Sequence, residues 1–347
     1  SSAPRALNLT LLLTEIADWG TLQKTRGKEE VAGLLTEHDH LVLPAIRAYH
    51  GRRIKSKDET LVAAFPSPTN AVLCAMAIQD RLAALVPQLP AAPQGQRSLL
   101  VVGALADAVE DQMRRLFDAM GVGPVAFLPA RRSDHMPAVG KDTLVLLAQP
   151  FLAETLRLLE GRGARRLAAP FPLGAEGTTA WLKVAADAFG IDELKFISAI
   201  APARERAIRA LARYRHSLAG KTIFFFPDSQ LEPALARFLC RELDMRVAEI
   251  GTPFLHQRIM AEELALLPAD VPIVEGQDVE RQIDRCRAAQ PDIVVCGLGL
   301  ANPFEAQGVT TKWSIELIFS PIQGYEQAGD LAELFVRPLL RRERLEV

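Results

Sequence analysis

The sequence predicts an α/β protein in which two parallel-sheet domains follow a smaller α+β segment. From residue 98 onward, short apolar runs alternate with stretches of helical period, as in parallel strands covered by helices on both faces. Residues 1–86 show a different order, namely strand, helix, hairpin and helix. Residues 87–97 (PQLPAAPQGQR) contain many turn-forming residues and no apolar period, which predicts a linker between the two parts.

The composition is typical of a globular protein with two or three domains. The chain has 347 residues, of which 49% are hydrophobic and 24% are charged. A formal net charge of −2 gives no electrostatic attraction to nucleic acid or to an anionic membrane. No apolar run approaches the roughly 18 residues that span a bilayer, and residues 1–5 lack the apolar core of a signal peptide. We therefore expect a cytoplasmic protein without a membrane span or a nucleic-acid partner.

Short local patterns predict the elements of residues 1–86. An apolar run at Asn8–Thr14 predicts a strand, and apolar residues near helical spacing over Gly27–Tyr49 predict a helix. We expect Pro44 to kink or split this helix. Two strands around a polar turn and an alanine-rich helix follow, at Arg52–Lys55, Thr60–Phe65 and Pro68–Leu85.

Three sequence motifs in residues 1–86 support a family assignment. The relevant blocks are Leu13-Thr-Glu-Ile16, the stretch Lys55–Pro68 (KSKDETLVAAFPSP) and Ala77-Ile-Gln79. They resemble the first half of a class III nucleotidyl cyclase domain, in which two aspartates on adjacent strands bind two divalent metal ions. The resemblance places Glu15 at the first metal position, and Glu59, or Asp58 if one residue is skipped, at the second.

These metal positions depart from the pattern of the cyclase family. The extra methylene of glutamate moves the carboxylate by about one ångström, which Mg²⁺ tolerates poorly. The second half of a cyclase domain, which supplies base selection and transition-state residues, has no counterpart here. We therefore expect a degenerate domain without cyclase activity. Taken by themselves, Glu15 also fits a strand-end carboxylate that faces water, and Lys57–Glu59 a solvated hairpin tip.

Strands and helices alternate from residue 98 onward. The first predicted domain, residues 98–218, has strands at Ser98–Gly103, Pro124–Leu128 and Thr143–Leu147 and helices at Asp107–Met120, Phe151–Leu159, Thr178–Phe189 and Ala203–Leu218. The second, residues 219–347, has strands at Lys221–Phe226, Arg246–Ile250, Pro272–Glu275 and Asp292–Cys296 and helices at Gln230–Glu242, Arg258–Leu267 and Val279–Ala288. We interpret both domains as Rossmann-like units.

A second resemblance covers residues 98–347. Its blocks are VGAL (102–105), LPARRSD (128–134), AQPFL (148–152), APFP (169–172), FFPDSQLEP (225–233), EIGTP (249–253), TKWSIE (311–316) and PIQGYEQAGDLAELF (321–335). In this order they resemble the N subunit of light-independent protochlorophyllide reductase, a nitrogenase-like enzyme. The resemblance implies a fold of nitrogenase component 1 type.

The same resemblance implies a reaction, a cofactor and partners. In that family the N and B subunits form a heterotetramer, an ATP-driven iron–sulfur protein delivers electrons, and a ring double bond of protochlorophyllide is reduced. The N subunit holds a 4Fe–4S cluster through cysteines of a first domain, which has no counterpart in this chain. We therefore expect that the ligands of the cluster are not present here and that the chain is not active alone.

The residues themselves indicate no metal site. Cys74, Cys240, Cys286 and Cys296 show no CxxC spacing and fit reduced, mostly buried thiols. None of the six histidines pairs with another at i, i+4. We assign no metal ligand and no catalytic residue.

Trp313 and Phe171 are the candidate pigment contacts. A large flat macrocycle needs aromatic and aliphatic walls, and the block that contains Trp313 matches the one near the pigment in the family. Phe171 lies among turn-forming residues ahead of a helix, in a loop that fits either a pocket wall or an ordinary connection. Trp313 also fits a core or subunit-interface residue.

Three further patterns fit ordinary structural roles better than binding. Asp228 or Ser229 is expected to cap the helix that follows, although the free amides there also suit an anion. The GxG of Cys296–Asn302 ends a strand but is a weak signal for a cofactor. Arg131 and Arg132 fit a solvated pair, with neutralisation of a carboxylate as the alternative.

Three functions compete at this point. The first is a subunit of a nitrogenase-like oxidoreductase for dark reduction of protochlorophyllide. Iron and acid-labile sulfide analysis of the purified protein is the experiment that best separates the candidate functions. The second is a regulatory or binding protein in which the cyclase-like part senses nucleotide or mediates dimerisation. The third is an artificial or mis-joined fusion without evolved activity.

Overall fold

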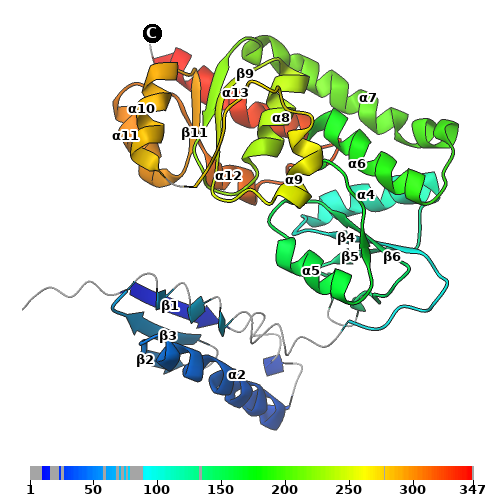
Figure 1. The fold of residues 1–347 in the computed structure, drawn as a ribbon, viewed down its shortest axis with the longest axis vertical. Helices are drawn as coiled ribbons and strands as arrows, with labels where there is room; N and C mark the ends of the chain where they lie inside the picture. Colours follow the sequence, from blue (N-terminus) through cyan, green and yellow to red (C-terminus); the bar gives the residue numbers. More distant parts are fainter. Residues whose placement is uncertain are drawn as a thin grey trace, which may run out of the picture. The chain divides into compact units, whose positions relative to one another are not determined.

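The chain forms two compact units, Ser1–Gln88 and Leu89–Val347 (Figure 1). The structure is a computed structural model that describes residues 10–15, 23–24, 27–57, 60–67, 70–71, 74–75, 77–78, 89–132, 135–276 and 278–345. Each unit is described by itself below.

The smaller unit contains a three-stranded antiparallel sheet in the order β1-β3-β2. Its elements are β1 (Thr10–Glu15), α2 (Lys28–Ala48), β2 (Arg52–Lys57) and β3 (Thr60–Phe65). The core consists of Val42, Ala45 and Ile46 of α2, alternate residues of β3, and Ala71, Cys74 and Ile78. Leu61, Ala63 and Phe65 of β3 face this core because successive side chains of a strand point to opposite faces. The predicted helix Pro68–Leu85 lies largely outside the described residues.

Helix α2 is not split at Pro44. Proline removes one backbone hydrogen bond from the interior of a helix. Val42, Ala45 and Ile46, on either side of Pro44, are all buried in the core of the smaller unit. The packing of this apolar face therefore holds the helix together through the proline.

The larger unit begins with a four-stranded parallel sheet in the order β5-β4-β6-β7. The strands are β4 (Ser98–Val102), β5 (Val125–Leu128), β6 (Thr143–Leu147) and β7 (Arg165–Arg166), and the helices between them are α4 (Asp107–Met120) and α5 (Ala153–Gly161). All five residues of β6 are buried. Such continuous burial is what a parallel strand covered on both faces requires, and it confirms the predicted sheet type.

A five-stranded parallel sheet follows, in the order β10-β9-β8-β11-β12. Its strands are β8 (Thr222–Phe225), β9 (Arg246–Thr252), β10 (Ile273–Glu275), β11 (Ile293–Cys296) and β12 (Thr311–Trp313). Its helices are α8 (Glu232–Leu243), α9 (Gln257–Leu264), α10 (Val279–Ala289), α11 (Leu298–Ala306) and α12 (Ser314–Phe319). Successive strands are added first on one side of β8 and then on the other. This doubly wound order confirms the predicted α/β class.

Three long helices complete the larger unit: α6 (Gly174–Ala188), α7 (Glu193–Leu218) and α13 (Ala328–Leu345). Helix α7 begins ten residues before the predicted start at Ala203, because Asp192 caps it by accepting a hydrogen bond from the Lys195 amide at 3.0 Å. Helix α13 lies along α7 (Figure 1). The Gln112 side chain of α4 donates to Gln327, just before α13, at 2.7 Å, which ties the start of the unit to its end.

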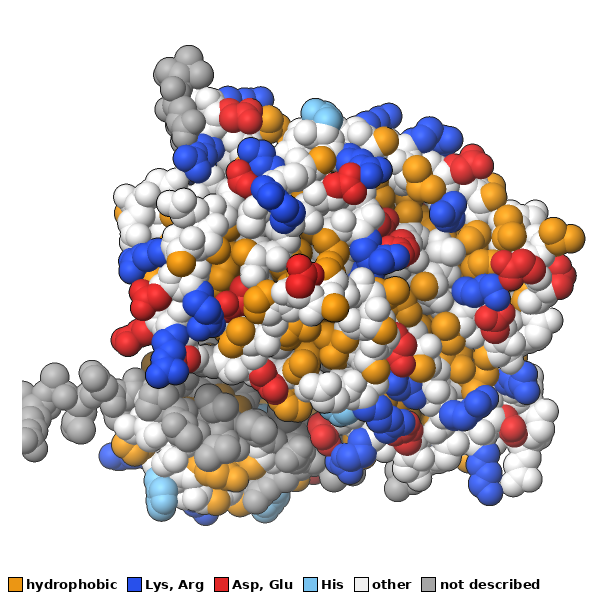
Figure 2. All heavy atoms as spheres, turned by 45° about the horizontal axis from the view of Figure 1, so that its top comes forward, with side chains coloured by type: hydrophobic (Ala, Val, Ile, Leu, Met, Phe, Trp, Pro, Cys, Tyr) orange, Lys and Arg blue, Asp and Glu red, His pale blue; other side chains and the backbone are white. Residues whose placement is uncertain are grey.

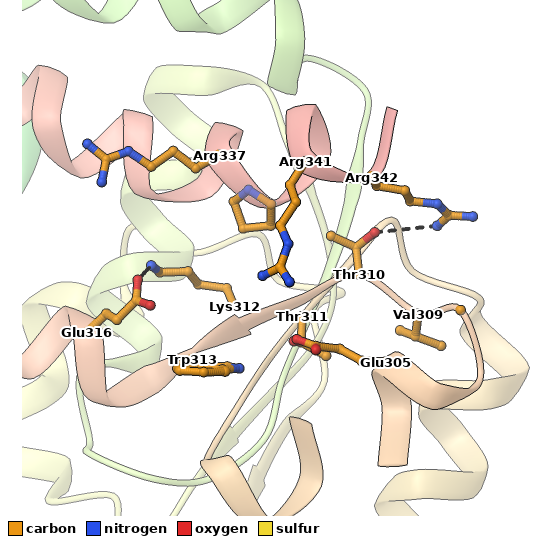
Figure 3. A pocket seen from close by; sticks show the side chains of 12 residues that line it. Glu305, Val309, Thr310, Thr311, Lys312, Trp313, Glu316, Arg337, Arg341 and Arg342 are labelled. Atoms are coloured by element: carbon orange, nitrogen blue, oxygen red, sulfur yellow. Dashed lines mark hydrogen bonds and ion pairs between the residues drawn. The ribbon is translucent and has the colours of Figure 1, made fainter. Parts of the chain in front are cut away.

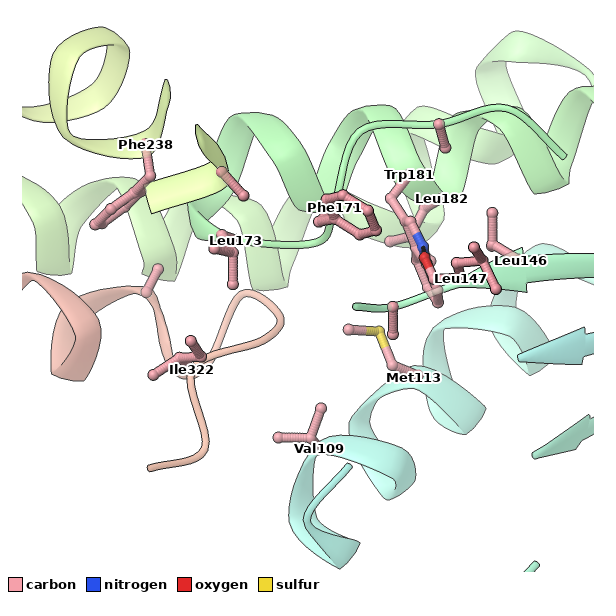
Figure 4. Close-up of a cluster of buried hydrophobic side chains, with 14 of the residues drawn as sticks. Val109, Met113, Leu146, Leu147, Phe171, Leu173, Trp181, Leu182, Phe238 and Ile322 are labelled. Carbon is pink, nitrogen blue, oxygen red and sulfur yellow. Dashed lines mark hydrogen bonds between the residues drawn. The ribbon is translucent and has the colours of Figure 1, made fainter. Parts of the chain in front are cut away.

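One continuous apolar core runs through both sheets of the larger unit. Figure 4 shows part of it, where Trp181 of α6 lies between Met113 of α4 and Leu147 of β6. The indole Nε1 donates to the Leu147 carbonyl at 2.7 Å, so the one polar atom of this buried ring has a partner. The Phe117 and Trp181 rings are 5.7 Å apart.

Candidate functional site

The structure separates the two candidate pigment contacts. Trp313 ends β12 and is half buried, where it packs against a small apolar cluster that includes Phe226 and Phe304. Phe171 lies in the main core and is 1% exposed (Figure 4). A side chain so fully covered offers no surface to a ligand in this arrangement. Trp313 alone of the pair borders a cavity.

The cavity beside Trp313 has a volume of about 580 Å³, within the range that small-molecule sites occupy. It lies at the outer edge of β12, between α11, the beginning of α12 and the last turns of α13 (Figure 3). We call it the β12 cavity. Its lining residues are Glu305, Gly308, Val309, Thr310, Thr311, Lys312, Trp313, Glu316, Arg337, Pro338, Arg341 and Arg342.

Most charges around the β12 cavity are already paired. Lys312 is 3% exposed and donates to Glu316 of α12. Thr311 Oγ1 donates to Glu305 at 2.5 Å. Two guanidinium groups of α13 have partners, since Arg337 donates to Glu333 at 2.9 Å and Arg342 to Thr310 at 3.4 Å.

The geometry of the cavity suits binding more than catalysis. Trp313 supplies a flat apolar surface, and four of the lining side chains are cationic against two carboxylates. Thr311 donates to Glu305, but this contact is a lone hydroxyl–carboxylate pair. Among the described lining residues there is no histidine, and Lys312 is paired with Glu316, so no nucleophile–base–orienter arrangement is completed. A flat ligand that carries negative charge fits this combination.

Apolar side chains also reach the surface of the larger unit, and Figure 2 shows them gathered over the middle of the face in view. Several large ones follow the carboxyl ends of strands in the second sheet, where α/β proteins commonly bind ligands. We call this set the carboxyl-edge surface. It consists of Phe254 after β9, Leu298 after β11, and Ile315, Ile318 and Phe319 on α12. Phe319 is 80% exposed, which is costly unless something covers it.

A buried ion network escaped the sequence analysis. Arg237 of α8 is completely buried and donates to Glu263 of α9 at 2.7 Å, and also to the carbonyl of Leu173 at 3.0 Å. Glu263 in turn accepts from the Phe171 amide at 2.6 Å. The network therefore fixes the loop that buries Phe171. The signal in the sequence was weak, because Arg237 is one of four charged residues of α8 and an arginine in a helix also fits a solvent-facing position.

Glu242, at the end of α8, borders this network. It accepts from the Ala175 amide at 2.7 Å and lies 3.4 Å from Arg237. Burial raises the pKa of the Glu242 carboxyl to about 7, although Arg237 acts in the opposite direction. Because its partners are structural, this carboxylate belongs to the support of α6 and α8.

Two other predictions of local structure need revision. Neither Asp228 nor Ser229 caps α8. Instead, their backbone amides donate to the Glu232 carboxylate, at 2.9 Å and 2.6 Å, so these amides are not free to hold an anion. Arg131 is paired with Asp111 at 2.7 Å and with Glu110 at 3.0 Å, so it does neutralise carboxylates, both of them on α4.

The candidate cyclase metal positions are only partly described. Glu15 is the last residue of β1, opposite Thr60 in the register of the sheet. Asp58 and Glu59 lie outside the described residues. Their assignment stays a prediction.

The described cysteines do not fit an iron–sulfur cluster. Burial raises the pKa of the Cys286 and Cys296 thiols to about 12, and it also raises the pKa of Cys240. A cluster needs grouped thiolates. Within the described ranges, no three His, Cys, Asp or Glu residues lie close enough together to hold a metal ion.

The comparison with protein families decides the ancestry of this fold. Residues 50–340 match the model of the nitrogenase component 1 type oxidoreductases. The chain belongs to this family. The match begins within the smaller unit and covers both parallel sheets.

Two curated relatives with high sequence identity to this chain are the same kind of subunit. The light-independent protochlorophyllide reductase subunit N of Rhodopseudomonas palustris (strain BisB5) is 67% identical over 264 residues, which is 76% of this chain and 62% of the relative. The subunit N of Rubrivivax gelatinosus is 66% identical, over 76% of this chain and 61% of the relative. The chain thus spans about three fifths of the length of the curated relatives that it matches.

Solved structures support the nitrogenase component 1 fold. "Nitrogenase Cp1 at pH 6.5" superposes with a TM-score of 0.57 at 16% sequence identity, over 76% of this chain and 64% of that one. "Nitrogenase Cp1 at pH 5" gives 0.58 at 14% identity, over 78% and 61%. Among the helices that the structure describes, none is both long and apolar enough to cross a membrane.

Proposed function

We propose that this chain is a subunit of a nitrogenase-like oxidoreductase that reduces protochlorophyllide in the dark, in the biosynthesis of chlorophyll or bacteriochlorophyll. The observation that carries the proposal is the 67% identity over 264 residues to the N subunit of that reductase. Identity at this level supports a shared ligand, because side chains that line a site must match that ligand in shape and charge.

The chain contributes binding surfaces to a larger assembly. Its proposed partners are the B subunit, with which it forms the heterotetramer, and an ATP-driven iron–sulfur protein that delivers electrons. We propose that the carboxyl-edge surface is covered in that assembly, since Leu298 and Phe319 are too exposed for an isolated protein in the cytoplasm. A 4Fe–4S cluster supplies one-electron chemistry in this kind of enzyme, and the described cysteines do not hold it.

Trp313 is the proposed pigment contact. Its half-buried ring borders the β12 cavity and provides a flat apolar wall for a macrocycle. Phe171 is not part of the proposed site, since it lies in the main core and does not line the β12 cavity. The isolated chain offers only one wall of a site, so it covers only part of the surface of the macrocycle. We therefore expect it to bind protochlorophyllide with a Kd of about 1 μM or weaker.

We propose that residues 1–86 form a degenerate cyclase-like unit that serves interaction and not catalysis. The order strand, helix, hairpin and the antiparallel sheet β1-β3-β2 support an α+β unit of that type. Glu15, Asp58 and Glu59 stand at the altered metal positions, so cyclic nucleotide formation is not expected with Mg²⁺ or Mn²⁺. The larger part then comprises the two Rossmann-like domains 98–218 and 219–347, after the linker 87–97.

Co-purification tests the proposed subunit role. The full chain, without a tag, is expressed together with a tagged B subunit of the reductase, and the eluate is analysed for both. We expect the parent chain to elute with the B subunit and Phe319→Asp to do so much less, because a buried charge in an apolar contact is costly. Glu343→Lys, a charge change at an exposed position of α13, is the matched control. Failure of the parent chain to elute with the B subunit would refute the proposal.

A further inference from the structure

The β12 cavity contains one cationic group that the rest of the site does not explain. Arg341 points from α13 into the cavity, toward Thr311 and Lys312 (Figure 3). The structure gives Arg341 no hydrogen bond or ion pair with any described residue. Arg337 and Arg342, on the same helix, extend to either side and have partners. Arg341 is thus the cationic lining residue that is available to a ligand, as far as the described residues show.

We infer that Arg341 binds the free carboxylate of the tetrapyrrole whose ring lies on Trp313. This inference rests on the proposed function and adds to it the chemical group that the site recognises. A guanidinium offers a planar fork of donors that matches a carboxylate in a two-point contact. The two carboxylates that line the cavity do not pair with Arg341, because Glu305 accepts from Thr311 and Glu316 accepts from Lys312.

The two features of the cavity match two features of the pigment. Trp313 offers a flat apolar surface, and Arg341 offers positive charge on the opposite wall (Figure 3). Protochlorophyllide has a flat macrocycle and one free carboxylate, and its methyl ester has the same macrocycle without the charge. A ligand held only by stacking would not distinguish acid from ester. A ligand held also by Arg341 would.

The size of the effect follows from the exposure of Arg341. This side chain is exposed in the unliganded chain, so its ion pair is partly screened by water. Hydrogen bonds to charged groups are stronger than neutral ones, and ring stacking removes some of that water. We expect the free acid to bind roughly three- to tenfold more tightly than the methyl ester.

The test is a titration of the full chain with protochlorophyllide and with its methyl ester, followed by pigment absorbance. Arg341→Met keeps a long side chain and removes the charge. In this variant the free acid should bind as weakly as the ester, whose affinity should not change. Arg344→Met is the matched control, because Arg344 is an exposed arginine of the same helix that does not line the cavity. It should keep the preference for the acid.

Each outcome decides between the proposals. Equal binding of acid and ester by the parent chain, or an unchanged preference in Arg341→Met, would overturn the role of Arg341. If Trp313→Ala then weakens both ligands equally, the pigment site itself still stands. Absence of any pigment binding by the parent chain would overturn both the inference and the placement of the pigment at Trp313. The subunit role is decided separately by co-purification with the B subunit.

Discussion

Arg237 donates to Glu263 at 2.7 Å, and neither side chain is exposed to solvent. The pair joins α8 to α9 and, through the carbonyls of Phe171 and Leu173, both helices to the loop before α6. A buried pair of this kind contributes little over an apolar pair of the same volume, but loss of one partner leaves an uncompensated charge. Its role is therefore to specify one arrangement of these elements.

Arg237→Ala should destabilise the larger unit by about 3–5 kcal/mol, because it leaves the buried Glu263 carboxylate without its cation. Replacement of both residues by methionine should cost less than either single replacement. Urea unfolding followed by circular dichroism measures these free energies. The control is Arg281→Ala, which removes an exposed pair with Asp278 and should cost under about 1 kcal/mol. Similar losses for Arg237→Ala and the double variant would contradict the argument.

Gly177→Ala should also destabilise the larger unit. A Cβ at this position would lie 2.2 Å from Arg237 Nη2 and 2.6 Å from the Phe171 carbonyl oxygen, so the network would have to shift. We expect a cost of about 1–3 kcal/mol, typical of overpacking. Gly299→Ala is the control, since nothing lies within 4 Å of its Cβ position in α11 and alanine favours a helix. The prediction fails if thermal unfolding ranks the two variants equally.

Glu242 should make the stability of the larger unit depend on pH. The pKa of its carboxyl is about 7 in the folded chain against an ordinary value of 4.5, so the folded state binds more protons between these two values. The free energy of unfolding should therefore fall as the pH rises from about 4.5 to about 7, by at most about 3 kcal/mol, and then level off.

Glu242→Gln isolates this contribution. The amide keeps an acceptor for the Ala175 backbone and does not titrate in this range. We expect the parent chain to lose stability relative to this variant between pH 5 and pH 8, as measured by urea unfolding at each pH. Parallel pH profiles for the parent chain and Glu242→Gln would show that Glu242 does not titrate in that window.

Purified chain should carry no stoichiometric iron–sulfur cluster. The described cysteines are not grouped, and burial raises the pKa of Cys286 and Cys296, which disfavours thiolate ligands. Iron and acid-labile sulfide analysis after anaerobic reconstitution measures this directly. About four iron atoms per chain, lost in Cys74→Ala, would be the contrary result.

The sequence predicted most elements of both sheets because their signals are local. The helix Asp107–Met120 was expected at these residues, since its apolar positions follow a 3.6-residue period and Gly121 ends it in a left-handed conformation. Strands such as β6 are apolar after their first residue, Thr143, and do not fit solvent-facing segments. Both signals are contained in stretches shorter than fifteen residues.

The helices α11, α12 and α13 escaped the sequence analysis, as did features that depend on contacts between distant residues. Strand β12 has only three residues, and its buried Lys312 hides the apolar signal until Glu316 is placed beside it. Phe171 lies among turn-forming residues that fit a pocket wall or an ordinary connection, and only the contacts with Arg237 and Glu263 show that this loop is held in the core. Of the residues around the β12 cavity, the sequence singled out Trp313, whereas Arg341 could be recognised only from its position in space; the role of Trp313 as a pigment contact stays a prediction.

The hydrogen bond between Gln112 and Gln327 joins residues that are 215 positions apart. A nascent chain that has emerged as far as Ser320 therefore contains all strands of both parallel sheets. It still lacks helix α13 and Gln327, whose side chain accepts a hydrogen bond from Gln112 of α4. We expect such an intermediate to be cut readily by proteases in its first sheet as well as its second. The larger unit then becomes protected in one late step, when Gln327 and helix α13 have left the ribosome.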